Sequence, residues 1–148
     1  ALDFLWQEPR VTPIWPNAYS QGFIAGQNMA GAERKYGGGL AMNSIGFYGL
    51  PTISAGIANP PEDGGYEVLT YVDEEKEIYR KLVFKGDKLV GYVLVGDVDK
   101  AGRFTGYIRN QVPVTQEVKL HLQDNRPTPL EWPEDIFQQR WNPQARLR

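Results

Sequence analysis

The residue types that carry most enzyme chemistry are scarce in this chain. It has no cysteine and one histidine, His121, which leaves no thiolate nucleophile and no cysteine-ligated metal, and we expect His121 to lie at the surface. The glycines of KYGGG, residues 35–39, are not followed by the Lys-Ser/Thr pair of a phosphate-binding loop, so we interpret them as a flexible connector. The residues by themselves predict no self-sufficient catalytic apparatus.

Two acidic groups are candidates for metal ligands, and both have a simpler explanation. The run at 73–75 crowds one short turn, whereas a calcium site needs more oxygen ligands at loop spacing, so we predict a solvated turn. Glu131, Glu134 and Asp135 flank Pro133, and we interpret them as the acidic beginning of a last helix. The sequence therefore predicts no metal site.

The stretch IWPNAYSQGFIAGQNMAG, residues 14–31, is the part best suited to contact a ligand. Pro16 at its start and Gly31 after its end predict a helix over 16–30. The first turn of a helix presents free N–H groups, which suit a phosphate or a polarised carbonyl oxygen, and Trp15 could form a wall for a planar ring. The alternative is a helix that only packs tightly through the small residues on one side, Ala18, Gly22, Ala25, Gly26 and Ala30.

The elements around this helix predict an α+β fold with a small antiparallel sheet and packed helices. Alternating residues over 66–98 predict a three-stranded meander, and Gly86-Asp87 suits a two-residue hairpin of type II′ or I′. In chain order, strands are expected at 40–49, 50–58, 66–73, 77–85 and 88–98. The residues expected to be buried are Val68, Leu82, Phe84, Val93, Val95 and Phe104.

Helices are expected after the meander, and a linker or helix remnant before the first helix, over 1–13. Asp99 is placed to cap a helix at 100–111, and Thr115 to open another at 115–124. Residues 133–141, PEDIFQQRW, predict one more helix.

Length and charge limit the classes of partner. The 148 residues suit roughly one domain, and 16 Lys and Arg against 18 Asp and Glu give a net charge of -2, unlike a nucleic-acid-binding protein. No apolar run reaches the ~18 residues of a membrane helix, and no signal peptide is visible. We expect a cytoplasmic protein with no nucleic-acid or membrane partner. The first residue is Ala1, which suggests a processed chain or an excised piece.

Three blocks of sequence resemble one enzyme family. ALDF…PIWPNAYSQGFIAGQNMAG, then GGGLAMNSIGFYGLPTISAG, and then YRKLVFKGDKLVGYVLVGDVDKAGRFTGYIR are similar to the C-terminal part of FAD-dependent pyridine nucleotide-disulfide oxidoreductases. The branch is that of NADH:rubredoxin reductase and the nitrite reductase large subunit. The resemblance covers roughly residues 1–122. It implies a remnant of the FAD-binding domain at 1–31 and a C-terminal interface domain at 32–122, with residues 123–148 as an extension.

The resemblance also implies a role for the first helix. Its N-terminus would point at the pyrimidine edge of the flavin ring, where oriented N–H groups favour the reduced flavin. The implied FAD-contacting residues are Trp15, Pro16, Asn17, Ala18, Met42, Asn43 and Ser44. The parent enzyme would pass a hydride from NAD(P)H to FAD, and electrons then to a redox protein or another acceptor.

The implied partners are the N-terminal FAD and NAD(P)H domains of that parent. Without them we expect this chain to be colourless and inactive, because a few contacts to one ring edge do not hold FAD. Residues 1–30 are expected to fold back irregularly or to pair with a second copy through Phe4, Leu5, Trp6, Tyr19 and Phe23. The alternative from another class is a stand-alone, non-enzymatic interaction or dimerisation module with the same fold.

Overall fold

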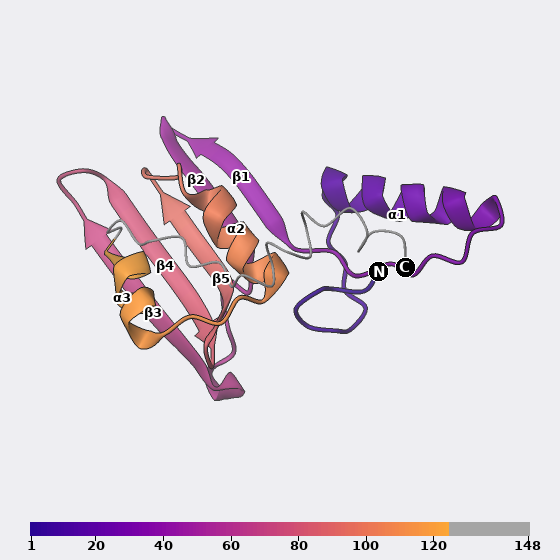
Figure 1. Ribbon diagram of the computed structural model, residues 1–148. Helices are drawn as coiled ribbons and strands as arrows, with labels where there is room; N and C mark the ends of the chain where they lie inside the picture. Colours follow the sequence, from indigo (N-terminus) through magenta and orange to yellow (C-terminus); the bar gives the residue numbers. More distant parts are fainter. Residues whose placement is uncertain (125–148) are drawn as a thin grey trace, which may run out of the picture.

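The structure, a computed structural model, describes residues 1–124 and builds them around one five-stranded antiparallel sheet (Figure 1). The predicted meander is confirmed, and the two shorter strands form a hairpin whose second strand pairs with the last strand of the meander. The α+β class is therefore confirmed. The strands, in the spatial order β1-β2-β5-β4-β3, are β1 (Met42–Phe47), β2 (Leu50–Gly56), β3 (Tyr66–Asp73), β4 (Ile78–Lys85) and β5 (Lys88–Val95).

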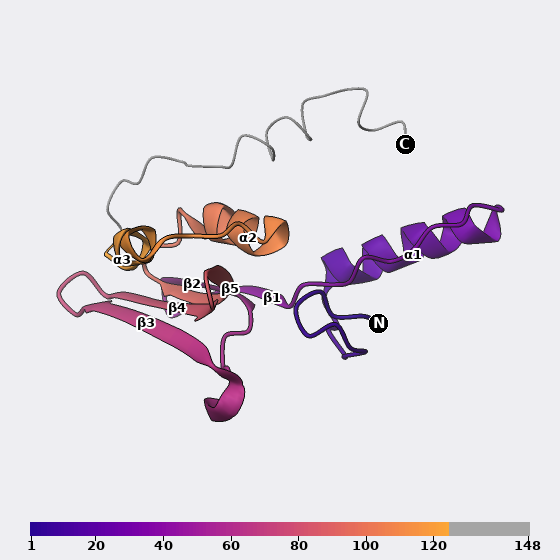
Figure 2. The ribbon, with the colours of Figure 1, turned by 60° about the horizontal axis from the view of Figure 1, so that its bottom comes forward.

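The described helices are α1 (Trp15–Met29), α2 (Ala101–Asn110) and α3 (Gln116–Gln123), with a 3-10 turn at Glu62–Gly64. Seen along the sheet, α2 and α3 lie together on one face, while α1 extends away from the domain (Figure 2). Because only Asn17 of α1 is buried, that helix keeps most of its surface free in the described chain.

The two predicted caps have opposite outcomes. The hydroxyl of Thr115 accepts a hydrogen bond from the Val118 N–H at 3.3 Å and opens α3, as predicted. The prediction for Asp99 is wrong, because the N-cap of α2 is Lys100 and no side chain caps it. Instead, the Ala101 N–H at the start of α2 donates to the Val98 carbonyl at 3.0 Å. The predicted helix after Pro133, with Glu131, Glu134 and Asp135, lies outside the described residues.

The main core lies between α2, α3 and the face of the sheet that these helices cover. Leu82, Phe84 and Phe104 are buried there, as predicted, and the hydroxyl of Tyr92 ties β5 to α2. That hydroxyl lies 2.8 Å from the Thr105 hydroxyl and donates to the Ala101 carbonyl at 3.2 Å. Burial of these apolar side chains drives the packing of the helices on the sheet and contributes about 1.5–3 kcal/mol for each large side chain.

Three residues predicted to be buried lie on the opposite face of the sheet. Strand register pairs Val68 with Val83, while Leu69 pairs with Leu82, so Val68 points away from α2 and α3 and is 43% exposed. Val93 and Val95 alternate with buried neighbours in β5 and are half-buried on the same helix-free face. Alternation within each strand was predicted correctly, but the phase between strands depends on turn lengths and on the register shift at Val83/Phe84.

The β4–β5 turn resolves one open alternative. Of its two residues, only Gly86 has a positive φ, +62°. A type I′ turn needs positive φ at both central residues and a type II′ turn only at the first. The turn is therefore of type II′.

Residues 1–13 and 35–39, predicted as a linker and a flexible connector, are instead bound to each other. The Phe4 N–H donates to the Gly39 carbonyl at 2.8 Å, and the Gly39 N–H donates to the Leu2 carbonyl at 2.9 Å. The side chain of Asp3 is buried and accepts from the N–H groups of Leu5 and Trp6. Because a Cβ at Gly38 would lie 2.9 Å from the backbone of Phe4, this glycine permits close approach.

Candidate functional site

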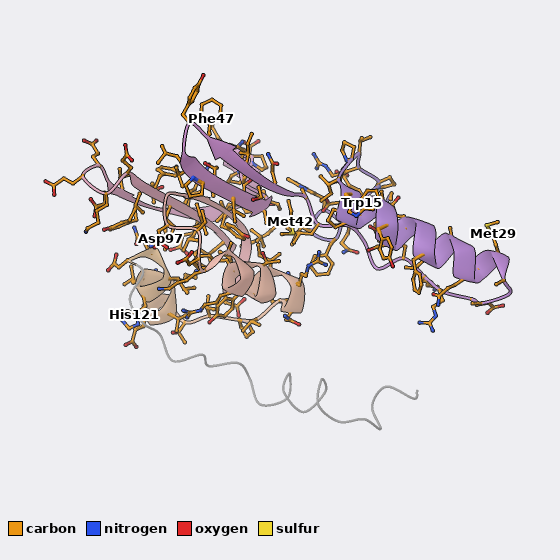
Figure 3. All side chains as sticks on the ribbon, turned by 90° about the horizontal axis from the view of Figure 1, so that it is seen from above. Trp15, Met29, Met42, Phe47, Asp97 and His121 are labelled. Carbon is orange, nitrogen blue, oxygen red and sulfur yellow. The ribbon has the colours of Figure 1, made fainter. Side chains whose placement is uncertain are left out.

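Two neighbouring hollows lie where the start of α1 meets the sheet. The larger, of about 440 Å³, lies between Ile14, Met42 and Asn43 and the end of β2. The smaller, of about 260 Å³, is lined by Asn17 and Ala18 of α1. Residues 10–13 wall both hollows. Figure 3 shows the geometry: Trp15 and Met42 lie on either side of this junction, and Met29 and Phe47 mark the far ends of α1 and β1.

The hollows thus bring together four of the seven residues predicted to contact FAD, namely Asn17, Ala18, Met42 and Asn43. Trp15, Pro16 and Ser44 are exposed and line neither hollow. Trp15 is 82% exposed, so the described residues leave its side chain largely uncovered.

The first turn of α1 presents free hydrogen-bond donors. No side chain caps the helix, the Ala18 N–H donates to the Ile14 carbonyl, and Pro16 has no N–H. Among the described residues, the backbone N–H groups of Trp15 and Asn17 have no acceptor. Such a helix end attracts an electronegative oxygen or nitrogen, because free donors and the helix dipole act together.

The side chain of Asn17 positions this helix end. It is 4% exposed, and its amide donates to the Leu40 carbonyl at 3.3 Å, directly before the sheet begins. Gly39 fits against the same amide, since a Cβ there would lie 2.7 Å from the amide nitrogen. Asn17 therefore fixes the start of α1 relative to β1 and the two hollows.

Arg10 is a site residue that the sequence did not reveal. It lines both hollows, its guanidinium lies 4.4 Å from the centre of the Trp6 ring, and it pairs with Glu8 at 3.2 Å. Both partners of this pair are exposed, so the pair itself stabilises the fold little. The fold of the N-terminal loop sets the position of Arg10. No pattern in the surrounding sequence QEPRV predicts that this side chain lies at the site.

The acidic turn at 73–75 and His121 lie away from the two hollows. In the described part of the chain, no three His, Asp or Glu side chains gather as a metal site. The turn at 73–75 is closed by Lys76, whose side-chain hydrogen bond lowers the pKa of Asp73, and His121 is partly exposed. None of the described helices has the length and apolar character required to cross a bilayer.

Comparison with known proteins matches residues 42–112 to the family described as the rubredoxin NAD+ reductase C-terminal domain. A nitrite reductase [NAD(P)H] of Bacillus subtilis is 29% identical over 105 residues, which are 70% of this chain and 13% of the relative. The epsilon subunit of an NADH-dependent phenylglyoxylate dehydrogenase of Aromatoleum evansii is 40% identical over 76 residues, 50% of this chain and 18% of the relative.

An NADH oxidase of Methanocaldococcus jannaschii is 36% identical over 109 residues, which are 64% of this chain and 24% of that protein. The chain therefore spans between 13% and 24% of the length of these relatives. Its similarity is to one part of each of them.

Proposed function

We propose that this chain completes the flavin site of an NAD(P)H-dependent oxidoreductase, because residues 42–112 match the rubredoxin NAD+ reductase C-terminal domain family and the chain is similar to part of several such enzymes. The parent takes electrons from NAD(P)H through FAD and delivers them to a redox protein or another acceptor. Its FAD and NAD(P)H domains are the partners of this chain. We place it in the cytoplasm, with which the absence of cysteine agrees.

The observation that carries this proposal is the junction of α1 with β1. The free N–H groups of Trp15 and Asn17 suit the acceptor atoms at the pyrimidine edge of a flavin. Met42 and Asn43 wall the adjacent hollow, and Arg10 adds a positive charge beside it. These residues suit one edge of the ring, but residues 1–124 contain no G-x-G-x-x-G sequence for the diphosphate.

The exposed aromatic side chains of α1 support a partner domain that covers this helix in the parent enzyme. Tyr19 and Phe23 are 65% and 57% exposed and stack on each other at 6.4 Å between ring centres. In the proposed parent, the FAD domain covers these rings. In the single chain, no described residue buries these rings.

When bound, FAD carries out the hydride and electron transfer, and this chain contributes oriented hydrogen-bond donors at one edge of the flavin ring. The side chain of Asn17 holds α1 at a fixed place, so that the donors of Trp15 and Asn17 are oriented before the cofactor arrives. Oriented donors favour negative charge at the ring edge without rearrangement.

The test is a chimaera that joins this chain to the FAD- and NAD(P)H-binding part of the Methanocaldococcus jannaschii NADH oxidase, in place of its own C-terminal part. We expect the chimaera to retain FAD and to reduce a dye with NADH, while the isolated chain stays colourless. Trp15→Pro removes one donor and is expected to lower the affinity for FAD, with Gln27→Ala, which lines neither hollow, as the control on the same helix. A folded chimaera without FAD, or an isolated chain that binds FAD and oxidises NADH, contradicts the proposal.

A further inference from the structure

The two edges of the sheet are protected to different extents. At the β3 edge, the Gln123 amide donates to the Thr70 carbonyl at 2.7 Å, so a side chain of α3 occupies an outward backbone acceptor. The Lys119 ammonium pairs with Glu67 of the same strand at 2.6 Å. Charges and a covering helix of this kind prevent another strand from pairing with an edge.

The β1 edge has none of these protections. Its residues, MNSIGF, include no charge and no proline, and all of 43–47 are exposed. Within the described residues, β1 pairs with β2 alone, and nothing bonds to its outer side. An exposed, uncharged edge strand is a template for a further strand.

The hydrogen-bond pattern identifies the free groups of β1. The Gly56 N–H donates to the Ala41 carbonyl at 2.8 Å, so 41, 43 and 45 bond towards β2. By the alternation of an antiparallel ladder, the N–H and C=O groups of Ser44 and Gly46 point outwards. The occupant of this edge is therefore an extended backbone.

We propose that the β1 edge pairs with the β1 edge of a second copy of this chain, antiparallel about a two-fold axis at Ile45. Ser44 of each copy then exchanges hydrogen bonds with Gly46 of the other, about four bonds in total. On the helix-free face, Ile45 meets its own copy and Phe47 meets Asn43. Ile45 and Phe47 are 49% and 60% exposed in the single chain.

A second copy suits this edge in charge and in access. The strand is uncharged, so two copies meet without like charges, and Ile45 packs against Ile45 of the other copy. Phe47 lies at the end of β1 away from α1, which leaves the approach open (Figure 3). One pair of strands buries less than a standard interface, so the dimer is weak and depends on concentration.

Cysteine cross-linking tests this pairing, because the chain has no cysteine of its own. Ile45→Cys places two thiols across the axis, and Val72→Cys, 56% exposed on β3, is the matched control. We expect Ile45→Cys to form disulfide-linked dimers at least about tenfold faster than Val72→Cys, because thiols held across the axis have a high effective concentration. Equal rates overturn the proposal.

Two further variants separate strand pairing from other contacts. Ser44→Pro removes an outward N–H and no β1–β2 bond, so it should slow Ile45→Cys cross-linking to the control rate without changing thermal unfolding. In a chain without an introduced cysteine, the single substitution Ile45→Lys should lower the fraction of dimer that sedimentation detects over a series of protein concentrations. The proposal fails if the dimer persists in Ile45→Lys and is lost in Phe23→Ser, since α1 then forms the contact.

Discussion

The glycines of α1 provide a direct test of whether that helix is built for a covering partner. Gly22 and Gly26 lie inside α1, and a Cβ at either position would meet no atom within 4 Å. Each glycine in an exposed helix interior costs about 1 kcal/mol relative to alanine. The double variant Gly22→Ala/Gly26→Ala should therefore stabilise α1 by about 2 kcal/mol.

This gain is local, because α1 is not packed on the sheet and only Asn17 of the helix is buried. We expect amide exchange in the middle of α1 to slow by about 30-fold, the ratio that corresponds to 2 kcal/mol. The denaturant midpoint of the sheet domain should not move. The matched control is Gly102→Ala in the packed helix α2, which should raise the global free energy of unfolding by about 0.5–1 kcal/mol.

The same double variant should impair assembly in the chimaera, because two added methyl groups hold the FAD domain away from α1. The expected pair of results is a more stable helix and a weaker complex. Unchanged exchange in α1 would show that contacts already hold the helix, and an unimpaired complex would show that its small residues face no partner. Either result refutes the reasoning.

Three other predictions concern the packing of the domain. Asn17→Ala removes the buried hydrogen bond to the Leu40 carbonyl and should weaken the attachment of α1 by about 1 kcal/mol. Amide hydrogen exchange in the first turns of α1 should then be faster. An unchanged exchange rate would contradict the positioning role of Asn17. Gly91→Ala would drive a Cβ into the Ile57 carbonyl and should cost about 3 kcal/mol or more in denaturant unfolding, whereas Gly46→Ala, in open space, should cost little. Hydrogen bonds from Lys119 and then Gln116 lower the pKa of Glu67 below its ordinary 4.5, so its stabilisation is complete above pH 4.5 and is lost as pH falls through the lowered pKa. The difference in unfolding free energy between wild type and Glu67→Gln should therefore shrink in acid, and a difference that is constant from pH 7 to 3 would contradict this assignment.

The sequence by itself determined the local elements of this protein. Pro16 and Gly31 predicted the limits of α1 to within one or two residues, and Thr115 predicted the cap of α3. The meander followed from alternation and from the Gly86-Asp87 turn. These features depend on residues within a few positions of each other, where dihedral preferences and capping bonds act directly.

The tertiary structure decided which faces and which distant residues meet. Val68 is exposed because the register between strands sets the phase of each face, and no single strand records that register. Arg10 joins the site, and Gly39 packs against Asn17, only because the N-terminal loop returns to the start of the sheet. Each of these contacts joins segments remote in sequence, and the free energy that selects them belongs to the packed whole and to no local stretch.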